Sequence, residues 1–466
     1  GFIYKQVINL CIKNKINDWN NFILKFEKDS IPQLFFFLRE CIFRRIGDYQ
    51  KYLSFVSQIQ NLGIEIPENE QCYVDCASHF KNAIVRINNN SITKKISLKN
   101  KKEKRIVIGL SCWGEDFLDS FLNLCLPSLI SNGNLHELVK HRKVIFVIHT
   151  NDAGISVISS SKIIKKIETM GINIIYELIN NQLLGWIMKD PNFIYWHLGM
   201  CQSIELSIAS KLNADYHLLM PDTIYSKNHF KGIIKIIAKN EKVITRVMLS
   251  AKKEKITVEL EKYKNKNNAI SVPASDLCAM CLKYISVLSE NWLITNNDIK
   301  KDMPSDPFVA FESESSLQIF AAHQTILFLS QEIVKANEKR FFAALDSELD
   351  LLIPMNTNLY LPQINDEVFV IALNSESRKL ISEPNGSLTC FASKFWLSCN
   401  NSKSSWRFFE KSTTDRINRK LLPNRVFMKQ EDIYNTSELI KKTLLSKFPE
   451  LTLDEIKRKK IIESMV

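Results

Sequence analysis

The sequence predicts an α/β protein: a mostly parallel sheet flanked by helices, preceded by an all-helical segment and followed by a helix-rich extension. Three observations predict this class. Apolar residues recur at helical spacing near the N-terminus, short β-rich runs then alternate with helical stretches, and the end of the chain is amphipathic and charged. A chain of 466 residues is long enough for more than one domain.

Residues 1–93 form the predicted helical N-terminal domain. From Phe2 to about Ile92, apolar side chains recur three and four positions apart, which is typical of amphipathic helices. A dense basic run follows from Thr93 to Arg105, and we interpret residues 94–105 as a basic linker. An open alternative is that this run contacts anionic lipid head groups or nucleic acid.

Strands and helices then alternate along the chain. The predicted strands are Ile106–Leu110, Lys143–His149, Ile172–Leu178, Tyr216–Met220 and Lys242–Leu249. The helical stretches between them are Glu115–Ile130, Ser161–Met170, Leu198–Leu212 and Phe230–Lys239. This alternation indicates a parallel sheet, and such sheets bind ligands at the carboxyl ends of their strands.

The pattern becomes less regular after about Ala251. Helices are predicted over Ser275–Glu290 and Gln318–Glu338, and a β-rich run covers Glu367–Leu373. We assign residues 106–375 to the α/β domain and 376–466 to a C-terminal extension. The last part, from about Asp432 to Val466, predicts a terminal helix pair.

Composition narrows the classes of function. With only 12 Gly and no glycine-rich phosphate motif, the sequence argues against P-loop nucleotidases and the common dinucleotide enzymes. A net charge of +12 is compatible with anionic partners, but the general bias of the chain toward Ile, Lys and Asn is the stronger explanation for it. The 11 scattered cysteines are typical of a reduced compartment. The one C-x-x-C pair, Cys278 and Cys281, lies on an apolar helical stretch that favours core packing over a zinc site.

Cellular location follows from the apolar runs. None approaches the ~18–20 residues that a membrane span requires. We therefore expect a cytoplasmic protein, with peripheral attachment to the inner face of the membrane left open. The chain begins with Gly1 rather than Met, so the sequence does not define the true N-terminus.

Candidate binding residues follow three of the predicted strands. After the first strand come Leu110, Ser111, Trp113 and Glu115, at a turn that leads into a helix. An aromatic ring there can stack on a base, and a helix N-terminus favours anions; the alternative is that the acidic residues only cap the helix. Asp152 follows the second strand, where it can accept from a nucleobase N–H or cap the next turn. Asp222 follows the fourth strand.

The fourth strand carries a resemblance to a known family. The segment from Asp215 to Tyr225, DYHLLMPDTIY, resembles the hhhhDxDxh stretch of GT-A-fold, nucleotide-sugar-dependent glycosyltransferases of the bacterial type. Asp222 matches the second acidic position, and Met220 stands in the first, where its thioether is a poor ligand for Mg²⁺ or Mn²⁺. The resemblance covers about residues 105–250, more weakly to about 375. It implies that the loop after the first strand holds the nucleoside and that Asp152 lies near the base.

The resemblance also implies an activity. The chain would transfer a sugar from a nucleotide-diphosphate sugar to a glycan, lipid-linked or protein acceptor, as in the biosynthesis of cell-surface glycans, with no nucleic-acid partner. Asp222 would act on the ribose or diphosphate side of the donor, and Asp346 or Glu348 would take the acceptor proton. The alternative for Asp346 and Glu348 is a solvated turn. Asp222 and His323 would hold a divalent cation if one is used, and His323 is otherwise a core residue. Metal dependence is left open.

A rival interpretation comes from a different class of protein. The chain would be a non-enzymatic adaptor, or would bind nucleic acid or a membrane surface, on a degenerate transferase fold. Met220 is the residue that favours this rival.

Overall fold

The computed structural model describes residues 31–89, 103–190, 192–246, 248–286, 289, 293–294, 308–313, 316–321, 325–343, 352–353, 357, 359–360, 362, 368–375 and 403–407. For strands β8, β9, β10 and β14, only the backbone is described. The predicted helix pair at the end of the chain lies outside these residues.

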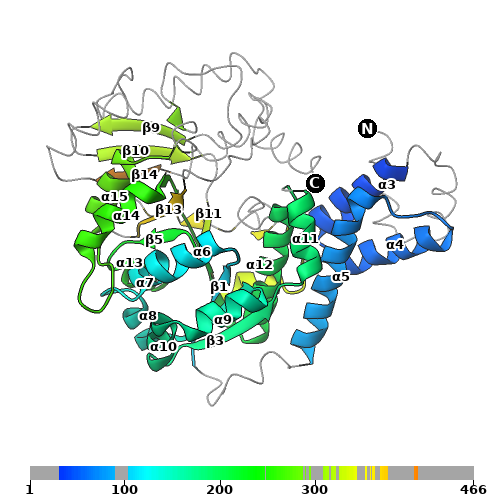
Figure 1. The fold of residues 1–466 in the computed structure, drawn as a ribbon, viewed down its shortest axis with the longest axis horizontal. Coiled ribbons are helices and arrows are strands. Elements are labelled where there is room, and N and C mark those ends of the chain that lie inside the picture. Colours follow the sequence, from blue (N-terminus) through cyan, green and yellow to red (C-terminus); the bar gives the residue numbers. More distant parts are fainter. Residues whose placement is uncertain are drawn as a thin grey trace.

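The described part of the N-terminal segment is helical, as predicted. It comprises α3 (Ile31–Leu38), the π-helical η2 (Arg39–Ile46), α4 (Tyr49–Asn61) and α5 (Glu68–Asn88). Asp48 begins α4, because its Oδ1 accepts a hydrogen bond of 2.9 Å from the amide of Lys51. Helices α3, α4 and α5 extend to one side of the molecule (Figure 1).

A seven-stranded sheet has the order β12-β6-β11-β4-β1-β2-β3. Its strands are β1 (Arg105–Ser111), β2 (Lys143–Thr150), β3 (Asn173–Leu178), β4 (Ala214–Leu219), β6 (Val243–Arg246), β11 (Thr325–Leu329) and β12 (Leu359–Tyr360). Strands β4, β1, β2 and β3 are parallel neighbours, and β12 is parallel to β6. Only β11 runs antiparallel to its neighbours in this sheet. The predicted α/β class with a mostly parallel sheet is confirmed.

Helices cover both faces of this sheet (Figure 1). One face shares its core with α6 (Glu115–Ser120), η4 (Phe121–Cys125), α7 (Leu126–Leu129), α8 (Leu135–His141), α9 (Asp152–Ser160), α10 (Lys162–Thr169) and α13 (His229–Ile237). The other face shares its core with α11 (Asn181–Lys189), α12 (Phe193–Lys211), α17 (Gln331–Ala336) and the N-terminal helices. Helix α12 is buried on nearly every side because it lies between the sheet and α5.

Two smaller sheets complete the described part of the fold. The first has the order β5-β13-β7 and comprises β5 (Thr223–Tyr225), β7 (Ser250–Lys252) and β13 (Val370–Asn374). It packs with α14 (Lys253–Leu260), the 3₁₀ turn η5 (Glu261–Tyr263) and α15 (Ala274–Lys283) around a core of its own. The second has the order β14-β10-β9-β8 and comprises β8 (Leu293–Ile294), β9 (Phe308–Ser313), β10 (Ser316–Ala321) and β14 (Lys403–Arg407).

The structure corrects several element predictions. The helix predicted over Gln318–Glu338 is wrong: β10 and β11 occupy much of it, and only α17 is helical. All five residues of β11 are buried, and a continuous apolar run has no period that separates a strand from a helix. The predicted helix Ser275–Glu290 ends at Lys283. The fifth strand ends at Arg246 rather than Leu249, and the described part of the C-terminal extension is the strand β14.

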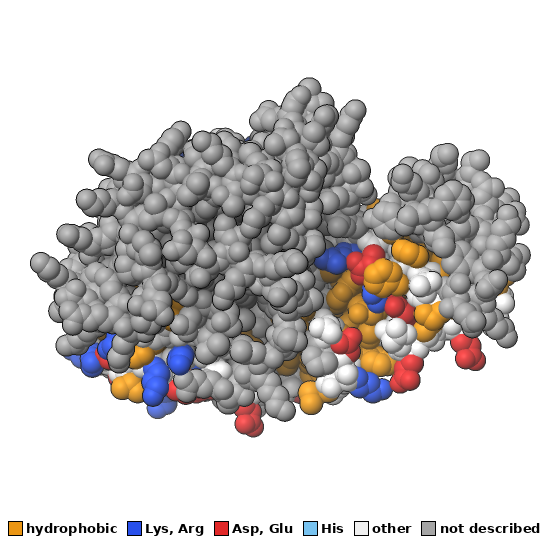
Figure 2. Space-filling view, turned by 90° about the horizontal axis from the view of Figure 1, so that it is seen from above, with side chains coloured by type: hydrophobic (Ala, Val, Ile, Leu, Met, Phe, Trp, Pro, Cys, Tyr) orange, Lys and Arg blue, Asp and Glu red, His pale blue; other side chains and the backbone are white. Residues whose placement is uncertain are grey.

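Large apolar side chains reach the surface beside charged ones. Figure 2 shows orange, blue and red side chains interspersed over the coloured part of one face, so neither sign of charge dominates there. Exposed large side chains of the N-terminal region include Phe36 and Val85. None of the helices in the described ranges is both long enough and apolar enough to cross a bilayer.

Candidate functional site

The carboxyl ends of β4, β1, β2 and β3 meet at one edge of the large sheet. In the parallel register Ser111 lies opposite His149, and Leu110 lies opposite Leu219. The amide of Cys112 donates to the carbonyl of His149 over 2.8 Å, which extends the pairing into the turns. The turns that contain Trp113, Asp152 and Asp222 therefore leave the sheet along the same edge, as the strand order requires.

A cavity of about 540 Å³ opens at the ends of β2 and β3. It is lined by His79, Arg86, Asp152, Tyr176, Glu177, Leu178, Ile179, Asn180 and Asn181. These residues come from the N-termini of α9 and α11, the end of β3, and the N-terminal helix α5. A polar hollow of this size at this edge can take a planar, nucleobase-sized ligand.

Asp152 presents an exposed carboxylate in this cavity. The sequence leaves two roles open for it, ligand binding and capping of the next helix. In the structure the cap of α9 is Asn151, whose Oδ1 accepts a hydrogen bond of 2.8 Å from the amide of Gly154. Within the described parts of the chain, no hydrogen bond or ion pair engages the Asp152 carboxylate. It is therefore available to a ligand.

The N-terminal helix α5 supplies one wall of the cavity, which the sequence did not predict. Arg86 Nη2 lies 2.9 Å from Glu177 Oε2, at the end of β3. Burial, and then the charge of Arg86, lower the pKa of His79 to about 4. His79 is therefore neutral at pH 7, and one of its ring nitrogens can accept a hydrogen bond.

Tyr176 and Asn180 are further polar groups of the cavity. Burial, followed by the charge of Glu168, raises the pKa of Tyr176 to about 12, so its hydroxyl stays protonated and can donate. Asn180 caps α11, because its Oδ1 accepts a hydrogen bond of 2.9 Å from the amide of Gln182. The first turn of α11 is thus fixed at the cavity wall.

The loop after β1 lies at the same edge but does not line the cavity. The Trp113 ring meets the His197 ring edge-on, with centroids 4.9 Å apart. Ser111 lies beside the Cys201 thiol, and Glu115 is exposed at the start of α6. Leu110 is fully buried in the core, so its side chain cannot contact a ligand at this edge.

A buried acid lies beneath this loop. Glu205 Oε2 accepts a hydrogen bond of 2.7 Å from the hydroxyl of Tyr216, and Oε1 lies 3.6 Å from His149 Nε2. Burial raises the pKa of Glu205 to about 8, against the opposing effect of the hydrogen bonds from Tyr216 and the Leu110 backbone. Burial, and then His197, lower the pKa of His149 to about 3. Both side chains are thus neutral at pH 7.

Asp222 lies in the turn between β4 and β5 and is partly buried. Its carbonyl oxygen accepts a hydrogen bond of 2.7 Å from the amide of Leu373, so strand β13 fixes the backbone of this turn. The thiols of Cys112 and Cys125 lie within electrostatic range of its carboxylate. Burial raises the pKa of the Cys125 thiol to about 12, so this thiol is neutral.

A divalent cation fits this turn poorly. Mg²⁺ and Mn²⁺ prefer oxygen ligands, whereas Met220, Cys112 and Cys125 offer sulfur beside the single carboxylate of Asp222. In the described ranges, no group of three or more His, Cys, Asp and Glu side chains is arranged to hold a metal. The described residues around Asp222 therefore do not fit Mg²⁺ or Mn²⁺.

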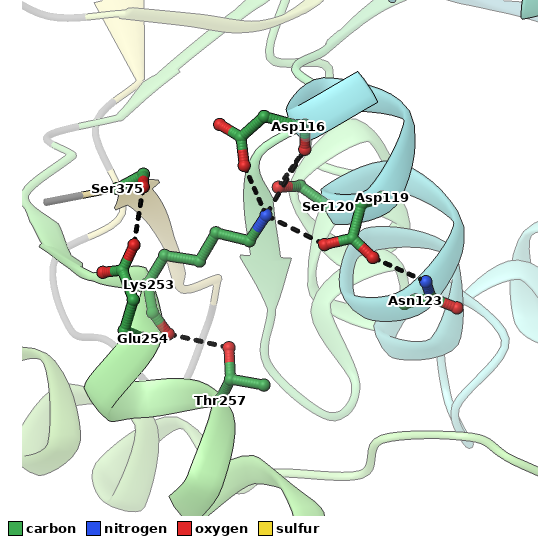
Figure 3. Close-up of polar contacts among 8 residues, drawn as sticks. All are labelled: Asp116, Asp119, Ser120, Asn123, Lys253, Glu254, Thr257 and Ser375. Carbon is green, nitrogen blue, oxygen red and sulfur yellow. Dashed lines mark hydrogen bonds and ion pairs between the residues drawn. The ribbon is translucent and has the colours of Figure 1, made fainter. Parts of the chain in front are cut away.

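Lys253 forms ion pairs with helix α6, which follows the loop after β1 (Figure 3). Lys253 Nζ, at the start of α14, lies 2.6 Å from Asp116 Oδ1 and 2.9 Å from Asp119 Oδ2 on α6. Burial opposes ionisation of Asp119, but hydrogen bonds from Lys253 and Asn123 outweigh it and lower the pKa of Asp119. The Asp116 carboxylate therefore forms an ion pair with Lys253. Glu115, its neighbour in the turn after β1, is exposed.

Three predicted residues lie outside the described residues: His323, Asp346 and Glu348. Their assignments as metal ligand and acceptor base stay predictions. Of the other predicted residues, the structure brings Asp152 into the cavity and places Ser111, Trp113, Glu115 and Asp222 along the same edge.

Comparison with known proteins gives no assignment. The sequence matches no protein-family model, and it is significantly similar to no curated protein.

Proposed function

We propose that this chain is a glycosyltransferase of the GT-A type, which moves a sugar from a nucleotide-diphosphate sugar to a glycan, lipid-linked or protein acceptor. One observation carries the proposal: the Asp152 carboxylate lies in the cavity at the ends of β2 and β3. Asn151, not Asp152, caps helix α9, so the carboxylate is not used as a helix cap. A carboxylate at this place can accept a hydrogen bond from a nucleobase N–H.

The nucleoside would lie in the cavity. Asp152 accepts from the base, and the Tyr176 ring offers an apolar face with a donor hydroxyl. His79 and Arg86 close the side formed by α5. This arrangement supports selectivity for one base, because a base with a mismatched edge would leave buried polar groups unpaired.

The donor phosphates and sugar would extend along the edge from β2 toward β4. The order β4-β1-β2 supports this path, since it places the loop after β1 between Asp152 and Asp222. Asp222 would then lie on the ribose or diphosphate side of the donor. A base must accept the proton of the acceptor hydroxyl, and Asp346 or Glu348 stays our prediction for that role. A cytoplasmic location, with peripheral contact to anionic membrane, accompanies this proposal.

A non-enzymatic adaptor is the second candidate. Met220 favours it, because the sulfur side chain occupies the place of an acidic residue beside Asp222. Such a protein would bind a partner without turning over a donor.

Two experiments together test the proposal. The first is a thermal-shift panel of UDP, GDP, CMP, dTDP and their common sugars, each with and without Mn²⁺ or Mg²⁺. One nucleotide class should raise the Tm, because a ligand that binds only the folded state stabilises it by mass action. If no nucleotide raises the Tm, the result would contradict the transferase proposal and favour the non-enzymatic adaptor.

The second experiment measures nucleoside diphosphate release with wild type and Asp222→Ala. The variant should fold normally, because Asp222 pairs with β13 through its backbone carbonyl, and turnover should be lost. A fully active Asp222→Ala protein would contradict the role of Asp222. Glu65→Gln, an exposed acid between α4 and α5 that does not line the cavity, is the matched control and should keep full activity.

A further inference from the structure

Four polar side chains from four different elements meet on the face of the sheet that α13 covers. They are His217 of β4, Tyr225 of β5, His229 of α13 and Arg246 of β6, and we call them the Arg246 cluster. The ring centroids of Tyr225 and His229 are 4.7 Å apart, and those of His217 and His229 are 6.0 Å apart. Arg246 acts electrostatically on all three rings. The cluster is enclosed, because its three rings are fully buried and Arg246 is 3% exposed.

The polar atoms of this cluster lack hydrogen-bond partners. In the described part of the chain this is true of Nε, Nη1 and Nη2 of Arg246, both ring nitrogens of His217 and Nε2 of His229. The hydroxyl of Tyr225 makes no well-aligned hydrogen bond either, although it lies within interaction distance of Arg246 and Thr223. Nδ1 of His229 has a partner, the carbonyl of Phe369 at 3.3 Å. Buried polar groups are almost always paired, so this concentration of unpaired atoms calls for a missing partner.

The missing partner must carry negative charge. A guanidinium stays protonated in proteins, and an unpaired buried charge costs several kcal/mol. Among the described residues, the cluster contains no carboxylate and Arg246 makes no hydrogen bond to an acid. Cys125 lies within range of Arg246, but burial keeps its thiol neutral by raising its pKa to about 12. Arg105 is a useful contrast, since its buried Nη1 donates to the carbonyl of Leu212 over 2.8 Å.

The hydrogen-bond chemistry also fits an anion. The guanidinium of Arg246, the hydroxyl of Tyr225 and one N–H of His217 are donors. His229 donates through Nδ1 to a carbonyl, so its Nε2 is an acceptor and can take one of the remaining N–H groups of Arg246. A small anion held by three donors would thus satisfy the cluster.

We propose that the Arg246 cluster is an enclosed binding site for a small inorganic anion of the size of chloride. This site is separate from the cavity of Asp152 and goes beyond the proposed transferase function. Strand β5 begins directly after Asp222, so an anion on Tyr225 also stabilises the strand that holds the Asp222 turn. The enclosure favours a monatomic anion over phosphate, because no cluster member is appreciably exposed.

The test is a chloride titration against gluconate at constant ionic strength, with Tm as the readout. Wild type should show a saturable rise of a few degrees, because chloride binds only the folded state. Arg246→Met should show no rise, and in gluconate it should match or exceed the Tm of wild type, because the unpaired charge is gone. A Tm of wild type that does not change with chloride, or an equal rise in the variant, would overturn the proposal.

Two further variants and one further anion sharpen the test. Arg105→Met removes another buried guanidinium and should lower the Tm while keeping the chloride response. Tyr225→Phe preserves the packing and should weaken chloride binding several-fold, which chloride NMR line broadening measures even if Arg246→Met does not fold. Unchanged broadening in Tyr225→Phe would contradict the site, and a response to phosphate without one to chloride would contradict its size.

Discussion

Arg86 Nη2 lies 2.9 Å from Glu177 Oε2, and this ion pair joins helix α5 to the end of β3 at the wall of the cavity. The guanidinium is 43% exposed, whereas the carboxylate is 9% exposed. Partial burial reduces solvent screening, so the pair should contribute more than a fully exposed one. The cavity therefore depends on a contact between segments that are far apart in the sequence.

A double-mutant cycle with Arg86→Met and Glu177→Gln tests this contact. We expect a coupling free energy of about 0.5–1 kcal/mol, because the pair is partly screened by solvent. Urea denaturation of the wild type, the two single variants and the double variant gives the value. A coupling energy of zero within error would mean that the pair does not hold α5 to β3.

Gly109→Ala should destabilise the fold beneath the loop after β1. A Cβ at Gly109 would lie 2.0 Å from Glu205 Oε2 and 2.8 Å from Tyr216 Cε2, and both residues are fully buried. Overpacking of this kind costs about 1–3 kcal/mol, which urea denaturation measures.

Gly185→Ala is the matched control for this substitution. Gly185 lies within α11, and a Cβ there meets nothing within 4 Å. Alanine should therefore be neutral or stabilise by ~0.5–1 kcal/mol, because it forms helix better than glycine. Equal destabilisation by both substitutions would contradict the packing at Gly109.

The buried acid Glu205 predicts a pH dependence of stability. Its pKa is raised from 4.5 to about 8 in the folded state, so between these values the folded protein binds a proton that the unfolded chain has lost. Stability should fall with rising pH across this window, with a slope of up to ~1.4 kcal/mol per pH unit, and become flat above it.

Glu205→Gln should remove this dependence, because the amide does not titrate and can still accept from Tyr216. Denaturation midpoints of both proteins between pH 5 and pH 9 are the measurement. Parallel curves for wild type and Glu205→Gln would show that Glu205 keeps an ordinary pKa.

Lys253→Met should raise the pKa of Asp119. The substitution removes the ion pairs of 2.6 Å to Asp116 and 2.9 Å to Asp119. Burial of Asp119, which opposes its ionisation, is then no longer offset by the hydrogen bond from Lys253. The pKa of Asp119 is measurable by NMR titration of its carboxyl carbon. Lys262→Met is the control, because its pair with Glu259 lies at the surface, and it should leave Asp119 unchanged. An unshifted Asp119 in Lys253→Met would contradict the arrangement in Figure 3.

Much of the sheet could be predicted from the sequence, because its strands are continuous apolar runs bounded by polar turns. The runs at β1, β2 and β4 fall within two residues of their predicted bounds. Strand β11 is a similar buried run, but it lies within the longer stretch Gln318–Glu338, where no period separates a strand from a helix, so it was predicted as helix. Its antiparallel place between β4 and β6 depends on pairing between segments distant in the sequence.

The candidate site was predictable only where it follows a strand directly. Asp152 and Asp222 come from turns at the predicted edge, whereas His79 and Arg86 lie on a helix that precedes the sheet in the chain. No local pattern marks these two residues as cavity walls. Arg246 likewise appears as a single charge within a strand, and its burial among His217, Tyr225 and His229 emerges only from the tertiary fold.

The most direct test of the transferase proposal is the affinity of the nucleotide that gives the largest thermal shift, measured by calorimetry on wild type, Asp152→Asn and Glu65→Gln. A hydrogen bond to a charged group contributes about 1.5–3 kcal/mol, so Asp152→Asn should bind about 10–100-fold more weakly at an unchanged Tm of the free protein. Glu65→Gln should bind like wild type, because Glu65 does not line the cavity. Equal affinity of wild type and Asp152→Asn would contradict the assignment of the cavity to the nucleobase.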